Sequence, residues 1–188
     1  MTETGTCVPS RVESFDAWAD AQLERLRGHP LPDRVFNAAS TVGDFSAIWQ
    51  ATGLIRLVGG GGDRRRQAAV LAALLGAESL LVNQGVKRLF RRTRPTESGD
   101  ERYEVRTPTT SSFPSGHASS AMFAATVLTS WTGRRTAPLW FGLGSVVAVS
   151  RAYVRIHHAS DVIGGAALGL ALGQVAVRSG ATRMGIRR

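Results

Sequence analysis

The chain has 188 residues, a length that suits a single domain with a sizeable hydrophobic core. The formal net charge of +9 does not indicate a nucleic-acid partner, because the basic residues form short clusters beside apolar stretches, without interleaved aromatic residues or a nucleic-acid-binding motif. Cys7 is the single cysteine, which excludes an intrachain disulfide.

The single domain is expected to cover residues 1–188 and to begin with a polar tail and an amphipathic helix in residues 1–32. Residues 1–11 are expected to be disordered, and this region lacks the apolar run of a signal peptide. Between residues 12 and 27, apolar side chains recur at helical spacing with charged side chains between them. This helix packs either on the domain or in a membrane interface, and the sequence favours neither.

Two apolar segments follow a proline-rich break. Residues 33–58 are expected to form one helix of mixed polarity, which ends at Gly59. Residues 67–86 are rich in Ala and Leu, and about 20 such residues cross roughly 30 Å of hydrocarbon. Their one acid, Glu78, would be paired or functional there. The mean hydropathy of -0.04 is low for a membrane protein, but the apolar residues are concentrated in segments.

Two cations come directly after the second apolar segment. Lys87 and Arg94 are seven positions apart, nearly two helical turns, so both can face one way if the helix continues to Pro95. Lys87 is the only lysine among 23 basic residues, so the chain keeps a compact ammonium at this one place.

A second cluster of functional side chains stands at a predicted helix start. Ser115 offers a hydroxyl, Gly116 allows close approach, and His117 offers an imidazole. Free backbone N–H groups and the positive end of the helix dipole make such a start a natural anion site. The long polar loop before it, residues 96–112, is of a kind that is often functional.

The third cluster lies within residues 150–161 and supplies Arg151, His157 and Asp161. If a helix begins near Ser160, the Asp161 carboxylate can reach the His157 imidazole. A carboxylate that accepts the Nδ1 proton leaves Nε2 free as a nucleophile or a base. Such a pair alone is more often structural, and the two other clusters favour function.

The helix pattern predicts a topology. About five transmembrane spans are expected, at residues 44–58, 67–86, 117–131, 138–151 and 160–177. Taken singly, each of the last three is short and could be a core helix of a soluble bundle. Taken together, they place the arginine-rich loops on one side and all three clusters on the other. The positive-inside rule then predicts an all-α, multi-pass protein of the cell membrane, with its site on the extracytoplasmic side.

In order and spacing, these clusters resemble the three-part signature of the type 2 phosphatidic acid phosphatase superfamily, in its membrane lipid-phosphate phosphatase branch. The resemblance covers roughly Lys87 to Asp161. It implies a metal-independent hydrolase without a cofactor, because side chains supply the cations. The implied phosphate-binding residues are Lys87, Arg94, Ser115, Gly116 and Arg151.

The resemblance also implies the catalytic roles. His157 would attack phosphorus to form a phosphohistidine, Asp161 would orient it, and His117 would protonate the leaving oxygen. The four-residue offset to Asp161 selects His157 over the adjacent His158. One histidine must be neutral and the other protonated, so a bell-shaped pH dependence is expected.

Arg91 lies on the helical face of Lys87 and Arg94, so it is expected either to contact a second phosphate or headgroup or to be solvated. Arg155 is expected to be structural or interfacial.

The expected substrate is a lipid phosphate or a polyprenyl phosphate or diphosphate in the bilayer. The first alternative is a polyprenyl-phosphoryl-sugar phosphate of cell-wall synthesis, an association suggested by the Arg-, Ala- and Gly-rich composition typical of GC-rich bacterial genomes. The second is a catalytically inactive lipid-binding membrane protein. Vanadium-dependent haloperoxidases share the anion cradle but are much larger. The sequence does not indicate the oligomeric state.

Overall fold

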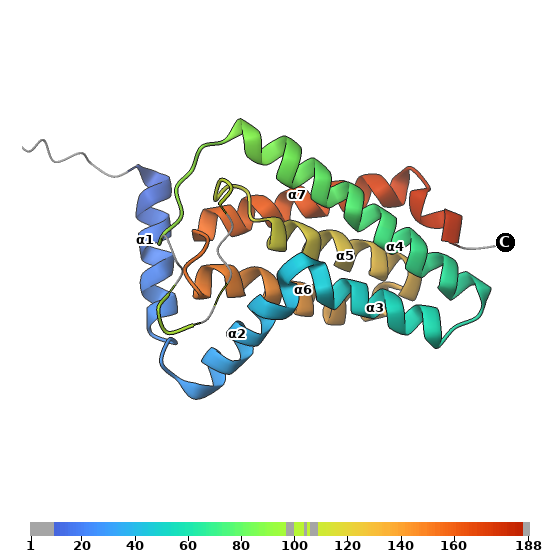
Figure 1. Cartoon of the computed structure of the whole chain (residues 1–188), viewed down its shortest axis with the longest axis horizontal. Coiled ribbons are helices and arrows are strands. Elements are labelled where there is room, and N and C mark those ends of the chain that lie inside the picture. Colours follow the sequence, from blue (N-terminus) through green and yellow to red (C-terminus); the bar gives the residue numbers. More distant parts are fainter. Residues whose placement is uncertain (1–9, 97–99, 104, 106–108, 186–188) are drawn as a thin grey trace, which may run out of the picture.

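The computed structural model describes residues 10–96, 100–103, 105 and 109–185. Within these residues the chain is all-helical and has seven α-helices joined by loops and short helical turns (Figure 1). The α-helices are α1 (Arg11–Glu24), α2 (Pro30–Gly43), α3 (Ala47–Val58), α4 (Gly62–Leu80), α5 (Gly116–Thr132), α6 (Ala137–Tyr153) and α7 (Ala159–Arg178). Most of the stretch expected to be disordered lies outside the described residues.

Helix α1 lies within the region where an N-terminal helix is predicted, and its amphipathic character stays a prediction. The Ser10 side chain accepts from the Glu13 N–H at 3.2 Å, and the Glu13 carboxylate accepts from the Ser10 N–H at 2.7 Å, a reciprocal cap. Its apolar side chains do not all face the bundle, since Trp18 is 60% exposed, whereas Asp16 is buried. Polar contacts of Asp16 therefore contribute to holding α1 on the bundle.

The single helix expected for residues 33–58 is wrong. The chain forms α2 and α3, separated by a 3-10 turn at Asp44–Ser46, where Ser46 has a left-handed φ of 58°. The two helices pack on different partners, α2 on α6 and α3 on α4, which requires the bend. Gly43 ends α2 beside the second motif, and a Cβ there would lie 2.8 Å from His117 Cδ2.

The helix does not continue to Pro95, the condition under which Lys87 and Arg94 would face one way. After α4 the chain makes a π turn at Leu81–Gly85 and a 3-10 turn at Val86–Leu89. Phe90 is already extended, with φ -122° and ψ 141°. Lys87 and Arg94 therefore do not share a helical face, and the loop between them decides how they meet.

Helix α5 is the centre of the bundle, and its residues from Ala118 to Leu128 are all buried. Helix α7 packs closely against it through glycines four residues apart, including Gly165 and Gly169. A Cβ on Gly169 would lie 2.0 Å from the Ser119 carbonyl oxygen, so the backbones meet directly at this point. Small residues at this spacing permit close helix packing in membranes.

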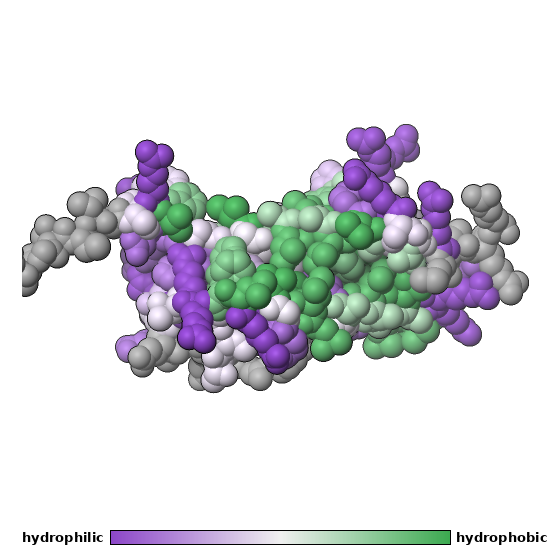
Figure 2. Space-filling model, turned by 90° about the horizontal axis from the view of Figure 1, so that it is seen from above, coloured by the Kyte–Doolittle hydropathy of each residue, from purple (hydrophilic) through white to green (hydrophobic). Residues whose placement is uncertain are grey.

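The surface agrees with association with a membrane. By length and composition, the helical segments Gly62–Leu89 and Ala159–Arg178 can each cross a bilayer, and Ala47–Val58 is a shorter apolar helix. Figure 2 shows apolar side chains across the middle of one face and polar side chains towards both ends of the long axis. On α3, Leu54 and Ile55 are 58% and 72% exposed. Exposed apolar surface of this kind is suited to lipid.

The contact between α5 and α7 can be tested at Gly169. We expect Gly169→Ala to lower the midpoint of thermal unfolding in detergent, because its methyl group would overlap the Ser119 carbonyl. The expected cost exceeds the roughly 1–3 kcal/mol of ordinary overpacking. Gly142→Ala in α6 is the control, since a Cβ there meets nothing within 4 Å. Equal midpoints for the two variants would contradict the close packing.

Candidate active site

The three sequence motifs meet at one end of the bundle, where the loop after α4 and the α6–α7 connection lie beside the start of α5 (Figure 1). A cavity of about 340 Å³ opens there. It is lined by residues of α3, α4, α5 and the connecting segments, namely Gly43, Asp44, Ser46, Gln50, Leu75, Gly76, Glu78, Ser79, Asn83, Lys87, Thr110, Gly116, His117, Ser120 and His157.

Lys87 and Arg94 both reach this cavity region despite the early helix end. Lys87 is only 5% exposed. The Arg94 guanidinium donates to the Ile156 carbonyl at 2.8 Å and the Thr110 carbonyl at 3.1 Å, and its Nη1 lies 3.3 Å from His157 Nε2. Backbone carbonyls of two loops thus hold Arg94 against the histidine.

Arg151 is buried beneath the site and is only partly satisfied. Its Nη1 donates to the Ser40 hydroxyl and, at 3.3 Å, to the Ser40 carbonyl. Its Nε and Nη2 have no hydrogen-bond partner among the described residues. Buried donors are nearly always paired, so the N–H groups of these two nitrogens favour a bound anion.

The geometry around His157 assigns its tautomer. A guanidinium can only donate, so Nε2 facing Arg94 must be unprotonated, and the hydrogen is on Nδ1. Burial lowers the pKa of His157 to about 3, the neighbouring cations Arg94 and Lys87 act in the same direction, and Asp161 opposes them. His157 is therefore neutral at pH 7, with an unprotonated Nε2 that faces Arg94.

The expected direct hydrogen bond from His157 to Asp161 is wrong in detail. The Nδ1 atom lies 3.7 Å from Asp161 Oδ2, beyond hydrogen-bond range. Asp161 is held elsewhere: its Oδ2 accepts from the His158 N–H at 2.8 Å at the start of α7 and from the Ser112 hydroxyl. Ser112 Oγ is also 3.4 Å from Nδ1, so the serine bridges the pair.

Sequence reasoning missed two residues that hold Asp161. Ser112 stands in the polar loop whose length suggested function, and that length was its only signal. No sequence signal pointed to Arg92, because it stands between Lys87 and Arg94 and is not part of the motif. Its Nη1 donates to Asp161 Oδ1 at 2.6 Å and to Ser160 Oγ at 2.7 Å, and its Nη2 donates to Asp16 Oδ2 at 2.5 Å. Arg92 thereby joins α1 to the start of α7.

His117 lies across the same cavity beside an acid that the sequence did not single out. Its Nε2 is 3.0 Å from Asp44 Oδ1, so Nε2 carries a hydrogen. Ser115 caps α5, accepting from the Ala118 N–H at 3.5 Å, and is fully buried below the cavity surface. Gly116 lines the cavity itself, and a Cβ there would lie 3.0 Å from Asn83 Oδ1.

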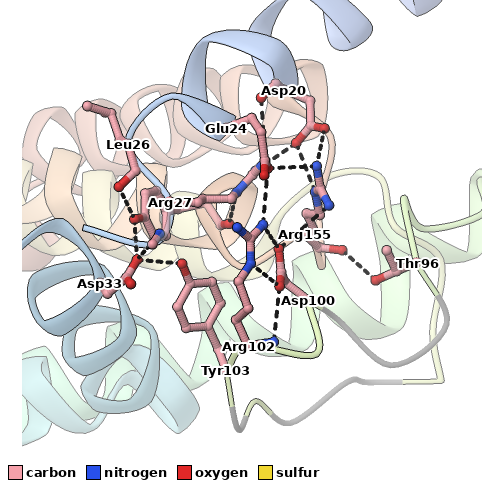
Figure 3. A network of polar contacts seen from close by, with 12 residues as sticks. Asp20, Glu24, Leu26, Arg27, Asp33, Thr96, Asp100, Arg102, Tyr103 and Arg155 are labelled. Carbon is pink, nitrogen blue, oxygen red and sulfur yellow. Dashed lines mark hydrogen bonds and ion pairs between the residues drawn. The ribbon is translucent and has the colours of Figure 1, made fainter. Parts of the chain in front are cut away.

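Arg91 and Arg155 lie away from the cavity. Arg91 is exposed in a neighbouring groove, so its expected shared helical face with Lys87 is wrong, because the helix ends at Leu89. Figure 3 shows Arg155 between the acids of α1 and Asp100, and its Nη2 donates to Asp20 at 3.0 Å and Glu24 at 2.9 Å. These contacts confirm a structural role for Arg155.

The fold and this site define a helical, membrane-associated protein with buried cations gathered around a neutral histidine. The profile of the PAP2 superfamily matches residues 67–184, which include all three motifs. The chain belongs to the PAP2 superfamily, as the resemblance implied.

Mycobacterial proteins are similar in sequence. The chain is 38% identical over 103 residues to the decaprenylphosphoryl-5-phosphoribose phosphatase of Mycobacterium tuberculosis strain H37Rv, over 55% of this chain and 56% of that one. It is 34% identical over 153 residues to the protein of the same name from Mycolicibacterium smegmatis, over 80% of each chain. The match thus spans about half the length of the M. tuberculosis relative.

Two solved structures share the fold. The first, a transmembrane PAP2-type phosphatidylglycerolphosphate phosphatase from Bacillus subtilis, superposes with a TM-score of 0.72 at 20% identity, over 96% of this chain and 90% of that one. LpxE of Aquifex aeolicus superposes with a TM-score of 0.67 at 22% identity, over 95% of this chain and 99% of that one.

The role of Arg92 can be tested by Arg92→Ala. We expect kcat for phosphate release to fall by about 10- to 100-fold with little change in KM, because a displacement of about 1 Å in a catalytic group can cost about 10²-fold. Arg88→Ala is the control, since Arg88 is exposed and bonds Gln84. A wild-type kcat in Arg92→Ala would remove Arg92 from the positioning of Asp161.

The protonation state of His157 can be measured by NMR on the substrate-free protein with labelled histidine. Because its pKa is lowered, the neutral form should persist as the pH falls from 8 to 5, where an ordinary histidine with a pKa of about 6.5 titrates. His157→Asn assigns the resonance by its disappearance. A midpoint near 6.5 would show that burial and the cations do not hold His157 neutral.

Proposed function

We propose that this protein hydrolyses a phosphate monoester on a membrane lipid, without a metal ion, through His157. The observation that carries the proposal is the unprotonated Nε2 of His157 beside Arg94, near Lys87 and the unpaired Nε and Nη2 of Arg151. Two buried cations, Lys87 and Arg151, and the half-buried Arg94 around a neutral imidazole suit a dianionic phosphate. Membership in the PAP2 superfamily supports the same chemistry.

In the first step, Lys87, Arg94 and Arg151 bind the phosphoryl oxygens, Arg151 through the N–H groups that lack a partner. The Nε2 lone pair of His157 attacks phosphorus, an N–P bond forms, and the bond from phosphorus to the lipid oxygen breaks. The Nδ1 proton stabilises the charge that develops on the imidazole, with Ser112 and Asp161 behind it.

His117 protonates the leaving oxygen and later deprotonates water. In this step His117 is doubly protonated, and one of its protons passes to the leaving oxygen, so that the lipid departs as an alcohol and a neutral imidazole hydrogen-bonded to Asp44 remains. The deprotonated imidazole then accepts a proton from water, whose oxygen attacks phosphorus. The N–P bond breaks, and inorganic phosphate and neutral His157 result. Gly116 and the N-terminus of α5 complete the anion cradle, with Ser115 fixing that helix start.

We further propose a multi-pass arrangement with the site on the extracytoplasmic side. All three motifs lie at one end of the bundle, and the arginine-rich α3–α4 and α5–α6 connections lie at the other, which the positive-inside rule assigns to the cytoplasm (Figure 1). Exposed Trp18, stacked on Phe15 with ring centroids 6.0 Å apart, supports an interfacial position for α1 within the single domain of residues 1–188.

The names of the mycobacterial relatives favour one substrate class among those expected from sequence. They are phosphatases of a polyprenyl-phosphoryl-sugar phosphate. We therefore place a lipid-linked sugar phosphate beside simple lipid phosphates and polyprenyl diphosphates as a candidate substrate.

The proposal is tested by phosphate release from detergent-purified protein in the presence of a chelator. The panel contains phosphatidate, a polyprenyl diphosphate and a polyprenyl-phosphoryl-pentose phosphate. We expect metal-independent release that falls by at least about 1,000-fold in His157→Ala, as removal of a nucleophile does. Release that requires added metal, or that survives in His157→Ala, would refute the mechanism. Binding of these lipids without any release would favour an inactive lipid-binding protein.

A further inference from the structure

Five polar residues that line the cavity have no role in the mechanism above, and we call them the polar wall. Ser79 and Asn83 come from α4 and the π turn after it, Gln50 from α3 and Ser120 from α5. Glu78 is the only charged residue among them. Because polar groups are costly within a membrane, a set of five on one wall calls for a ligand or a structural reason.

The carboxyl group of Glu78 can form more hydrogen bonds than the one described to Ser119. Glu78 is 4% exposed, and its Oε1 accepts from the Ser119 hydroxyl. An ionised carboxylate accepts about four hydrogen bonds, and a protonated one also donates, so capacity remains towards the cavity that Glu78 lines. Packing against α5 therefore explains only part of its chemistry.

The π turn brings this wall into line with the catalytic cations. Residues nine apart in an uninterrupted α-helix point about 180° from one another, which would separate Glu78 from Lys87. The extra residue of the π turn at Leu81–Gly85 and the 3-10 turn that follows at Val86–Leu89 change these directions. Both side chains therefore line one cavity. Asn83, inside this turn, donates to Ser79 Oγ at 3.1 Å and lies against Gly116.

The chemistry of the wall discriminates between ligands. A second phosphate would need cations beside the polar wall. Among the described cavity-lining residues the one lysine or arginine is Lys87, which the proposed mechanism already uses, and an ionised Glu78 would repel a second phosphate. An acyl chain would leave these polar groups unpaired. Hydroxyl groups both donate and accept, which matches carboxylate, amide and hydroxyl side chains. A cavity of about 340 Å³ is within the roughly 300–1,000 Å³ of small-molecule sites.

We propose that Glu78, Ser79 and Asn83 form a subsite for a hydroxyl-rich headgroup, a sugar or other polyol that carries the phosphate to be hydrolysed. This subsite rests on the proposed phosphatase function. It selects a lipid-linked sugar phosphate over a lipid diphosphate, since the sugar hydroxyls would bind this wall while the phosphate lies between His157 and His117.

The test compares three detergent-soluble, short-chain substrates: a prenyl-phosphoryl-pentose phosphate, a prenyl diphosphate and a phosphatidate. We expect the wild-type protein to prefer the pentose phosphate. Glu78→Gln should raise KM for that substrate by about tenfold, the effect of losing roughly 1.4 kcal/mol of binding, and change kcat/KM for phosphatidate by less than about twofold. Gln84→Ala, on the exposed side of the same turn, should leave both substrates unchanged.

Ser79→Ala repeats the test without altering a charge, in case Glu78→Gln impairs folding. An equal loss of activity on pentose phosphate and phosphatidate in these variants would overturn the subsite and leave both groups structural. A wild-type preference for the diphosphate would overturn it as well. By contrast, no release from any substrate, or undiminished release in His157→Ala, would refute the phosphatase function itself.

Discussion

The burial of the Asp161 carboxylate is the constraint on which the catalytic end of the molecule depends. This side chain is fully buried, and a buried charge is tolerated only when it is paired and hydrogen-bonded. Its oxygens accept from Arg92, Ser112 and the His158 N–H, and its backbone carbonyl accepts from the Ser115 N–H at 3.0 Å. The hydrogen bonds of Asp161 therefore join three loops, and these contacts hold the candidate site in place.

The parts of the structure that depend on local signals could be predicted from the sequence. Apolar length and glycine or proline breaks placed the later helices to within a few residues, and the helix starts at Gly116 and Ala159 follow from their flanking residues. The meeting of the three motifs could also be predicted, because antiparallel helices return the chain to the same end. That argument needs only the number of long helices between one motif and the next.

The contacts that complete the site depend on partners far apart in the chain, and local patterns do not report them. Arg92 bonds Asp16 and Asp161, 76 and 69 positions away, and His117 bonds Asp44, 73 positions away. The bend before Ala47 and the helix end at Leu89 have the same origin, since tertiary packing overrides helical propensity at both places. Sequence periodicity alone indicated neither the bend nor the helix end.

The two histidines differ in whether Nε2 carries a hydrogen, because they have different neighbours. A guanidinium offers only donors, so Nε2 of His157 presents a lone pair to Arg94, whereas a carboxylate offers only acceptors, so Nε2 of His117 presents a hydrogen to Asp44. Two histidines that line a single cavity thus present an acceptor atom and a donor atom, which the proposed mechanism uses as nucleophile and proton donor. Pairs of titratable groups in contrasting surroundings are how a site separates such roles. Arg94 and Asp44 therefore decide which histidine presents a lone pair at Nε2 and which presents an N–H.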